Sequence, residues 1–520
     1  MSGGIGGWVT KRAFLHGEKV ALVAGERRLT YAELDLRTDR VAAGLADHGV
    51  RRGDRVAVLL LNSIEFLELL LGCAKLGAIL VPVNVRLSAR EIGFILSDSG
   101  ADVFVFHAPL GGAARAALGE PGVRVRHTLL VGGEPADEEQ EFEAFVAAGE
   151  AGRPAGEIAG AEVAFIMYTS GTTGSPKGAM LTHDNIWWNA INVLGTEQGL
   201  RHQDVTVTVA PMFHIGGLGV HSLPLLYVGA TNVVLPTFDP RTTLAAMVEH
   251  RATVQFMVPA MWTALTQVPD FDSYDLSALT FGMGGGSPCP LPLLSFFQQR
   301  GLPFTEGFGM TETAPLVSVL DAAHVTSHAG SIGRAAMHVE ARIVDDDDRD
   351  VPPDHVGELV VRGPNVFVGY WMRPAETAEA FRNGWFHTGD LGRMDREGFI
   401  TLVDRKKDMI ISGGENVYPI EVEQVLFGHP DVLDVAVVGA PDPRWGEAVV
   451  AVVVPRRDGS SGPRLDRDAL IAWSRDRLAH FKCPREVHVT EELPRNATGK
   501  LLKTALRARY TGVEGGVVRR

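Results

Sequence analysis

Cysteine is scarce in this sequence. The three cysteines among 520 residues are Cys73, Cys289 and Cys483, and their wide spacing matches neither a metal-binding pattern nor a disulfide framework. The scarcity argues against a disulfide-stapled secreted domain and favours a reducing, cytoplasmic setting.

Long apolar runs are also missing. The most apolar stretch, residues 66–85, is interrupted by Glu68 and Lys75. It is therefore typical of a buried helix followed by a strand, and it is a poor candidate for a membrane span. The first twelve residues lack the basic-then-apolar order of a secretory signal peptide.

Positive charge is in short supply. Lys and Arg number 49 against 63 Asp and Glu, which gives a formal net charge of -14. This excludes a general nucleic-acid binder, because the phosphate backbone requires a basic surface. Small anionic ligands remain possible partners, since a local pocket can oppose the global charge.

The pattern of apolar residues indicates an α/β protein. Thr30 and Glu33 form a capping box that begins a helix, and Gly49 is placed to end it. Further along, short β-rich runs alternate with helical segments, which predicts largely parallel sheet layers. These runs span residues 56–61, 163–167, 205–209, 231–235 and 254–258.

The pattern changes after about residue 330. Strand-like runs at 339–344, 357–362 and 399–403 lie close together, which predicts a small, β-rich and more antiparallel subdomain. A charged break at 404–408 follows, so we expect residues 408–520 to form a separate, small α+β domain. Its predicted elements are a helix at 419–426, strands at 435–438 and 448–454, and a helix at 468–479.

One loop points to phosphate chemistry. Residues 168–178 follow the strand at 163–167, are rich in Gly, Ser and Thr, and end in a lysine, Lys177. Such a loop offers backbone amides, hydroxyls and one cation to a polyphosphate. It is not a Walker A loop, because Pro176 stands where that motif needs glycine and Gly178 follows the lysine. A flexible surface loop is the alternative, and its length and residue order argue against that.

This loop resembles the corresponding loop of the adenylate-forming superfamily, which includes acyl-CoA synthetases, amino-acid adenylation domains and firefly-luciferase-type enzymes. Further blocks similar to that family follow in its order from Thr30 to Lys503, nearly the whole chain. The resemblance is to carboxylic acid–CoA ligases that use ATP, Mg²⁺ and coenzyme A. It implies a large N-terminal domain, 1–404, and a mobile C-terminal domain, 408–520, which rotates about a hinge at 405–407 centred on Lys407.

The resemblance also implies which residues hold the nucleotide. Phe308 would offer the adenine a flat face, and Asp390 and Arg405 would meet the ribose. The implied ATP- and AMP-binding residues are Thr169, Ser170, Gly171, Thr172, Thr173, Gly174, Lys177, Gly285, Gly286, Glu306, Gly307, Phe308, Thr311, Asp390, Arg405 and Lys500.

Four of the implied roles concern the chemistry itself. Lys500 would be the catalytic lysine, whose ammonium stabilises an anionic transition state; losing such a group costs roughly two to three orders of magnitude in rate. Thr311 and His214 would join it in the catalytic site. Glu312 would bind Mg²⁺ with help from Thr169, although a carboxylate at a helix N-terminus is an alternative explanation for Glu312. Gly413 and Gly414 would leave room for coenzyme A.

The resemblance also implies which residues line the acyl pocket. His214, Met257, Met261, Gly284 and Met310 are implied to line it, and for His214 an ordinary core histidine is the alternative. Methionines favour an adaptable apolar pocket. Glycines at 216, 217, 282 and 284 suggest space for a chain, so we expect a medium- to long-chain fatty acid.

Other functions stay open. Phe213-His214 stands where amino-acid adenylation domains usually have a Phe-Asp pair, whose aspartate binds the substrate ammonium. This difference argues against an amino-acid substrate. A fatty acyl-AMP ligase that loads a carrier protein, another hydrophobic or aryl acid–CoA ligase, and a non-catalytic binder remain alternatives. Weak peripheral membrane contact and a homodimer are further options for partners.

Overall fold

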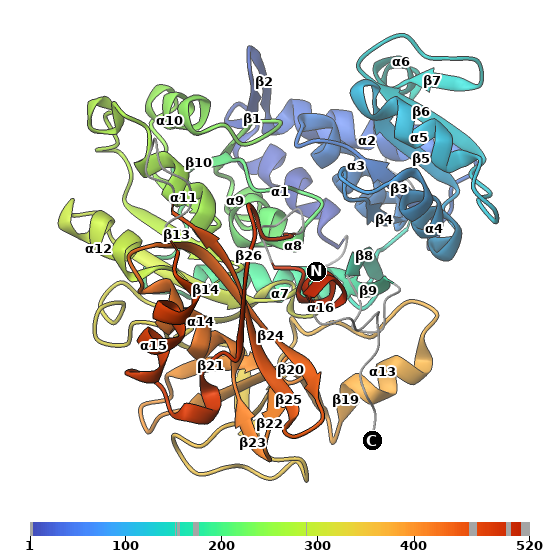
Figure 1. Ribbon diagram of the computed structural model, residues 1–520. Coiled ribbons are helices and arrows are strands. Elements are labelled where there is room, and N and C mark those ends of the chain that lie inside the picture. The colour runs from blue at the N-terminus through green and yellow to red at the C-terminus, as the bar shows by residue number, and fades with distance from the viewer. Residues whose placement is uncertain are drawn as a thin grey trace. The chain divides into compact units, whose positions relative to one another are not determined.

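The computed structural model describes residues 4–150, 152, 156–169, 176–287, 289–456, 465–495 and 501–510 (Figure 1). The chain divides into two compact units. The first comprises Met1–Glu340 with Val361–Phe386, and the second comprises Ala341–Val360 with His387–Arg520. The predicted hinge at residues 405–407 remains a proposal.

The largest sheet of the first unit has seven strands. Its strands are, in spatial order, β7 (Glu139–Glu141), β6 (His127–Val131), β5 (Val103–His107), β3 (Arg55–Leu59), β4 (Ile79–Pro82), β8 (Val163–Thr169) and β9 (Lys177–Thr182). The pairs from β7 to β8 are parallel, whereas β8 and β9 are antiparallel. The helices of this layer are α2 (Tyr31–Asp47), α3 (Ile64–Leu76), α4 (Ala89–Ser99), α5 (Gly111–Leu118) and α6 (Phe142–Ala148). The hairpin β8–β9 therefore presents the predicted phosphate loop at one edge of a parallel sheet.

Two smaller sheets complete the first unit. One has the order β10 (Val205–Thr208), β11 (Thr231–Val234), β1 (Val20–Ala24) and β2 (Arg27–Thr30). The other has the order β12 (Val254–Met257), β13 (Phe281–Gly285), β14 (Phe304–Gly309), β15 (Leu316–Leu320) and β16 (Arg334–Ala335). In the second sheet β12, β13 and β14 are parallel, and β15 and β16 are antiparallel.

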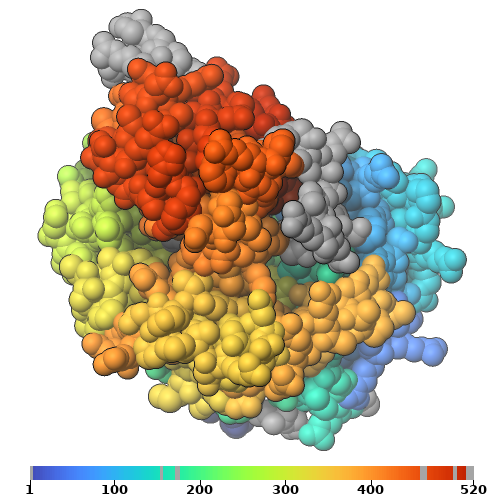
Figure 2. Space-filling model, turned by 60° about the horizontal axis from the view of Figure 1, so that its bottom comes forward, coloured from blue at the N-terminus to red at the C-terminus, as the bar shows by residue number. Residues whose placement is uncertain are grey.

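Several helices flank these two sheets. They are α1 (Gly6–His16), α7 (His183–Leu194), α8 (Ile215–Gly217), α9 (Leu223–Val228), α10 (Pro240–Glu249), α11 (Pro259–Thr266), α12 (Leu291–Gln299) and α13 (Pro374–Ala380). A π-helical turn, η2 (Leu218–Ser222), joins α8 to α9, and a 3₁₀ turn, η4 (Thr311–Thr313), follows β14. Helices α10–α12, yellow-green in Figure 2, contribute to the outer surface of the unit.

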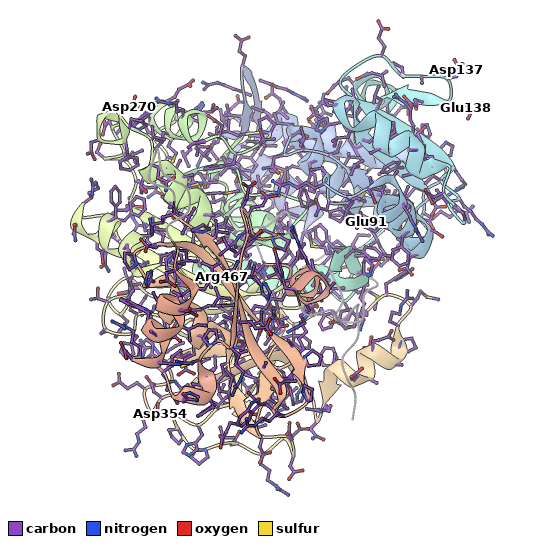
Figure 3. The ribbon with its side chains drawn as sticks, in the orientation of Figure 1. Glu91, Asp137, Glu138, Asp270, Asp354 and Arg467 are labelled. Atoms are coloured by element: carbon purple, nitrogen blue, oxygen red, sulfur yellow. The ribbon has the colours of Figure 1, made fainter. Side chains whose placement is uncertain are left out.

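Local sequence signals explain where helices begin. In α2 the Thr30 hydroxyl accepts from the Glu33 amide, while the Glu33 carboxylate accepts from the Thr30 amide. Ser88 and Glu91 make the same capping box at the start of α4, with Glu91 exposed at the surface (Figure 3). These boxes satisfy amides that a helix leaves unpaired. The predicted helix start at Thr30 is thus confirmed.

The second unit is built on two sheets. One has the order β17 (Glu340–Val344), β18 (Gly357–Arg362), β20 (Trp385–Met394) and β19 (Phe381–Arg382), with β21 (Ile400–Arg405) antiparallel to β20; β19 and the ends of some other strands fall in the first unit. The other has the order β23 (Glu415–Val417), β22 (Ile410–Ser412), β25 (Gly446–Pro455) and β24 (Val432–Asp442), with β26 (Glu486–Val489) beside β25. Its helices are α14 (Pro419–Phe427), α15 (Arg467–Arg475) and α16 (Lys503–Tyr510).

The predicted fold class is confirmed: parallel sheet layers, a β-rich part and a small α+β part are all present. One helix was predicted too long, since α15 ends at Arg475 and not at Ala479. The chain turns there, with Leu478 N bonded to Ser474 O, and a 3₁₀ turn follows at His480–Lys482. Residues 66–85 include most of α3 and all of β4, as the sequence predicted. Among the described helices, none is both long and apolar enough to cross a membrane.

Candidate active site

The strands around the predicted phosphate loop hold its two ends together. Thr169 ends β8 and Lys177 begins β9, and these two residues are register partners. The Thr169 hydroxyl donates to Lys177 O at 3.5 Å. Five residues predicted to bind the nucleotide lie outside the described residues: Ser170, Gly171, Thr172, Thr173 and Gly174. A ligand in this loop would sit beyond the carboxyl end of β8, where α/β sheets usually bind their ligands.

Strand β14 carries the start of the second predicted nucleotide-binding segment, residues 306–313, called the nucleotide block below. Glu306 is 5 % exposed, and its Oε1 accepts from Cys289 N at 3.0 Å. Its Oε2 is buried without a hydrogen-bond partner among the described residues. Burial raises the pKa of Glu306 to about 7, and the bond from Cys289 N opposes that shift. The carboxyl therefore anchors the loop after β13 and remains partly protonated near neutral pH. The following Gly307 and Phe308 are half-buried.

Glu312 lies on η4 beside a residue that sequence reasoning missed. The Tyr370 hydroxyl donates to Glu312 Oε1 at 3.0 Å, and Phe367 N donates to Glu312 O at 2.8 Å. The Lys177 ammonium is 5.5 Å from the centre of the Tyr370 ring. Tyr370 also forms a bridge with Ala179 on β9. The structure thus brings together Lys177 and Glu312, which the sequence separates, and Tyr370 connects them.

These side chains suit a magnesium ion that also contacts phosphate. Carboxylate and hydroxyl oxygens are the donors that Mg²⁺ prefers, and this ion usually takes few protein ligands and fills the rest with phosphate and water. Glu312 and Thr169 supply donors of those two kinds. Among the described residues there is no cluster of three His, Cys, Asp or Glu side chains, so a dedicated all-protein metal cage is not found in that part of the chain.

The glycine turn after β13 brings two strands into close contact. Gly285 pairs with Gly307 in the parallel ladder, and a Cβ on Gly285 would lie 3.0 Å from Gly307 O. Gly286 has φ +84°, which glycine tolerates better than other residues. The two predicted nucleotide-binding segments are therefore backbone neighbours.

His214 precedes α8 in the predicted acid-binding block, residues 211–217. Its Nε2 is closed off from solvent and has no hydrogen-bond partner within the described residues, and its ring packs on Phe213 at 4.9 Å between centroids. Burial, reinforced by the charge of Arg86, lowers the pKa of His214 to about 4. The imidazole is accordingly neutral at pH 7 and can offer a hydrogen bond but no charge.

The methionines implied in the acyl pocket occupy different environments. Met257 is fully buried, whereas Met261 on α11 and Met310 before η4 are half-buried. Met283 reaches over Gly307, at the position where a Cβ of that glycine would stand. Met283 also lines a small cavity with Leu316 and His221, whose volume of about 10 Å³ holds at most one water.

The space inferred from two of the pocket glycines is occupied. A Cβ on Gly282 would lie 3.0 Å from the Trp262 ring, and one on Gly284 would lie 3.2 Å from the Phe304 ring. Both glycines face the aromatic side chains that cover β13, because alternate strand residues point to opposite faces. Their small size allows rings to pack closely, so the inference that they make room for an acyl chain was wrong.

The other two glycines differ from each other. A Cβ on Gly217 would collide with Pro211 O, so no space is free there either. At Gly216 the nearest atom, on the Phe256 ring, would be 3.8 Å away. Gly216 is thus the one of the four glycines that leaves room beside the acid-binding block.

In the second unit the structure pairs Asp390 with Arg405. They are register partners on β20 and β21, and Arg405 Nε is 2.6 Å from Asp390 Oδ1. Thr388 supports both, because its hydroxyl accepts from Asp390 N at 3.0 Å and its carbonyl accepts from Arg405 Nη1 at 3.3 Å. The two residues implied to meet the ribose are thus neighbours.

The predicted hinge and coenzyme A residues lie in turns. Lys407 is exposed between β21 and β22. Gly413 and Gly414 form the turn between β22 and β23, with φ of +65° and +86°. Gly413 N donates to Trp445 O at 2.7 Å, and a Cβ on Gly413 would lie 2.9 Å from the Trp445 ring. Sequence reasoning missed Trp445, because its contact with Gly413 depends on a pairing between distant segments.

Lys500 lies outside the described residues. The segments on either side of its loop are described, and Arg495 and Leu501 form an antiparallel bridge. Arg495 also pairs with Asp434 of β24, with 2.7 Å between Nη2 and Oδ2. The base of the lysine loop is therefore attached to the sheet of the second unit.

Comparison with known proteins covers nearly the whole chain. A family model described as AMP-binding enzyme matches residues 9–371, and one described as AMP-binding enzyme C-terminal domain matches residues 421–500. The chain is 44% identical over 520 residues to a feruloyl-CoA synthase of an Amycolatopsis species, covering 98% of this chain and 99% of the relative. It is 38% identical over 488 residues to the long-chain-fatty-acid–CoA ligase FadD13 of Mycobacterium tuberculosis, covering 93% of each. Among solved structures it is similar to o-succinylbenzoate coenzyme A synthetase (MenE) of Bacillus subtilis in complex with ATP and magnesium ion, with a TM-score of 0.84, 32% identity and coverage of 98% and 99%.

Proposed function

This chain belongs to the AMP-binding enzyme family as an AMP-forming acid–thiol ligase, and we propose that it joins a hydrophobic carboxylic acid to coenzyme A, with an aromatic acid as the first candidate. ATP and coenzyme A are the cosubstrates of this class of ligase, and Mg²⁺ is its metal cofactor. We further propose a cytoplasmic setting, which agrees with the three free, buried cysteines.

One observation carries the proposal. Lys177 at the end of the phosphate loop lies 5.5 Å from the centre of the Tyr370 ring, and the carboxylate of Glu312 accepts a hydrogen bond from the hydroxyl of the same tyrosine. A cation and a carboxylate that share one neighbouring side chain suit a triphosphate with its metal ion, because the cation binds phosphate oxygens and the carboxylate binds the metal. The full-length likeness to coenzyme A ligases supports the same assignment.

The reaction proceeds in two displacements. In the first, a carboxylate oxygen of the acid attacks the α-phosphorus of ATP, forming the acyl-adenylate and releasing pyrophosphate. In the second, the thiol sulfur of coenzyme A attacks the acyl carbon, loses its proton and releases AMP. We assign Lys500 and Thr311 to the developing charge in the first step and Gly413–Gly414 to the path of the thiol in the second. When bound, Mg²⁺ supplies charge neutralisation of the phosphates.

Two observations favour an aromatic acid over a long chain. Three of the four pocket glycines are filled by neighbouring atoms, so the argument for a long chain loses its basis. The feruloyl-CoA synthase is also more similar to this chain than FadD13 is, at 44% against 38% identity. A planar ring beside Gly216 would stack on Phe256, an arrangement that aromatic rings favour.

A substrate panel tests the proposal. Purified enzyme is given ATP, Mg²⁺ and one acid at a time, from ferulate, cinnamate and indoleacetate to octanoate and palmitate, and pyrophosphate and acyl-CoA are measured. We expect the highest kcat/KM with an aromatic acid. A clear preference for palmitate would overturn the choice of acid, and no pyrophosphate with any acid would overturn the ligase assignment.

Acyl-adenylate formed without coenzyme A, followed by addition of coenzyme A or of an acyl carrier protein, distinguishes a coenzyme A ligase from an acyl-AMP ligase. A coenzyme A ligase converts its acyl-adenylate to acyl-CoA as soon as the thiol is added. Acyl-adenylate that accumulates in the presence of coenzyme A, and is consumed by an acyl carrier protein, would instead identify an acyl-AMP ligase.

A further inference from the structure

The buried face of α7 is lined by asparagines. This helix begins directly after β9, which carries Lys177. Asn185, Asn189 and Asn192 recur at spacings of four and three, so they share one face of the helix, and each is at most 4% exposed. The inner stripe of a helix is normally apolar, because a buried amide is unfavourable unless it is hydrogen-bonded. We therefore expect these three buried side chains to have hydrogen-bond partners.

Each asparagine binds the backbone of a different loop. Asn185 Nδ2 donates to Pro364 O at 2.8 Å and to Val366 O at 2.9 Å. Asn192 Oδ1 accepts from His338 N at 2.9 Å. These two side chains attach α7 to segments outside the acid-binding block and the nucleotide block.

Asn189 differs because it bridges those two blocks. Its Nδ2 donates to Gly219 O at 2.7 Å, in the π-helical turn η2 that continues the acid-binding block. Its Oδ1 accepts from Leu316 N at 3.0 Å, directly after the nucleotide block. The pairing of β14 with β15 shifts register between Phe308 and Gly309, and Leu316 is the partner of Gly309. At this irregularity the backbone amide of Leu316 is hydrogen-bonded by the Asn189 side chain. π-Helical turns of this kind are frequent at functional sites.

The two blocks are also in direct backbone contact at this point. A Cβ on Gly219 would lie 2.8 Å from Ala314 O and still closer to the Pro315 ring. Only glycine permits this approach. Gly219 of η2 is therefore packed against residues 314–315, and Asn189 is hydrogen-bonded to both segments.

We infer that Asn189 is a positioning residue, which holds the acid-binding block against the nucleotide block so that the acid's carboxylate meets the α-phosphate of ATP. This inference rests on the proposed function. Asn189 touches neither substrate; it acts through Gly219 and Leu316. Because adenylation requires two reactants in line, a small displacement of one block relative to the other slows the reaction while leaving each binding segment intact.

Asn192 provides a matched control. Asn189→Ala and Asn192→Ala remove the same side chain from the same buried helix face, but only the first releases the two blocks. We expect Asn189→Ala to lower kcat/KM for the acid in pyrophosphate release by about tenfold or more, the effect of leaving buried polar groups unpaired. KM for ATP should change by less than about twofold. Asn192→Ala should leave both parameters near wild type while lowering Tm to a similar extent.

A bisubstrate analogue gives a readout independent of turnover. An acyl-sulfamoyl-adenosine, with its acyl group taken from the best acid of the panel, spans both blocks, whereas AMP occupies one. Asn189→Ala should weaken binding of the analogue by about tenfold while leaving the Kd of AMP within about twofold. Asn189→Ser keeps a small polar group but is too short to bridge Gly219 O and Leu316 N, so it should weaken the analogue as the alanine variant does; it serves if the alanine variant does not fold.

Equal losses of analogue and AMP affinity, or equal kinetic losses in Asn189→Ala and Asn192→Ala, would overturn the inference. An acid-dependent release of pyrophosphate by the wild-type enzyme tests the proposed function separately. A wild type without that activity would contradict the function, whereas an active wild type with unaffected Asn189 variants would contradict the positioning role alone.

Discussion

The hydroxyl of Tyr370 donates a hydrogen bond to Glu312 at 3.0 Å, across a separation of 58 residues in the sequence. The ring of the same tyrosine lies 5.5 Å from the Lys177 ammonium. One side chain therefore orients the proposed metal ligand and faces the cation of the phosphate loop. Loss of a group that orients a metal ligand typically lowers metal affinity by about 10- to 100-fold.

The first prediction follows from this bond. Tyr370→Phe keeps the ring beside Lys177 and removes the hydroxyl from Glu312. The Mg²⁺ concentration for half-maximal pyrophosphate release should rise by about tenfold, within the range for loss of a group that orients a metal ligand. Binding of Mn²⁺ to the enzyme–ATP complex, measured by electron paramagnetic resonance, should weaken in parallel.

Tyr168→Phe is the control for this prediction. Tyr168 is the first residue of the predicted loop segment and lies within β8, and its hydroxyl donates to Asp98 at 2.7 Å. Its removal should leave the Mg²⁺ requirement unchanged. The same metal requirement in both variants as in wild type would contradict the role assigned to Tyr370.

The second prediction concerns Glu306 and pH. Burial raises the pKa of this carboxyl from its ordinary 4.5 to about 7. Between those two pH values the folded chain keeps a proton that the unfolded chain has lost, so the free energy of unfolding falls as pH rises through this window and stays lowered above it. Glu306→Gln removes the titration and keeps an acceptor for Cys289 N. Its free energy of unfolding relative to wild type should therefore increase by about 1–3 kcal/mol from pH 5 to pH 8.

Urea unfolding at the two pH values measures this difference. Glu340→Gln, at an exposed surface carboxylate, is the control and should show no comparable change between pH 5 and pH 8. If the advantage of Glu306→Gln were the same at both pH values, the carboxyl would not titrate as described.

The third prediction separates pocket glycines from packing glycines. Gly216→Ala should fold normally, because its Cβ would meet Phe256 at an ordinary 3.8 Å, and should lower kcat/KM for bulky acids more than for small ones. Gly284→Ala should instead lower Tm, because its Cβ would crowd the Phe304 ring at 3.2 Å. Overpacking of this kind typically costs about 1–3 kcal/mol. Thermal unfolding and the acid panel distinguish the two effects; unchanged acid selectivity in Gly216→Ala would remove that residue from the pocket.

The fourth prediction addresses Lys500. Lys500→Ala should reduce pyrophosphate release by roughly two to three orders of magnitude, the usual effect of losing a preorganised charge at the transition state. Conversion of supplied acyl-adenylate to acyl-CoA should be largely spared, because the lysine is assigned to the first step only. Arg509→Ala, at an exposed arginine of α16, is the control. An equal loss in both half-reactions would contradict the assignment of Lys500 to one step.

The sequence predicted those parts of the molecule that depend on local order. The capping box at Thr30 and the strand before the phosphate loop follow from periodicity and from residue types that act on their immediate neighbours. The pairing of Asp390 with Arg405 was implied only by resemblance, since fifteen residues and a strand reversal separate them.

The features that sequence reasoning missed depend on which residues face one another. Tyr370 stands in no charged or glycine-rich motif, and its importance appears only when its segment pairs with β9. The asparagines of α7 suggest a solvent-facing stripe, because a helix face rich in amides is usually exposed. The glycines at 282 and 284 were misjudged for the same reason: composition reveals a missing side chain, but not whether a neighbouring ring fills its place.

The crowding at Gly217, Gly219, Gly282 and Gly284 has a practical consequence for redesign of this ligase. Saturation libraries at those codons would be filled with misfolded proteins, since atoms of neighbouring residues already occupy the positions that new side chains would need. Diversity is better placed at codon 216, where an added Cβ meets only an ordinary contact with the Phe256 ring. An evolved change of acid preference should therefore arise there first, with the neighbouring glycines kept as fixed points of the scaffold.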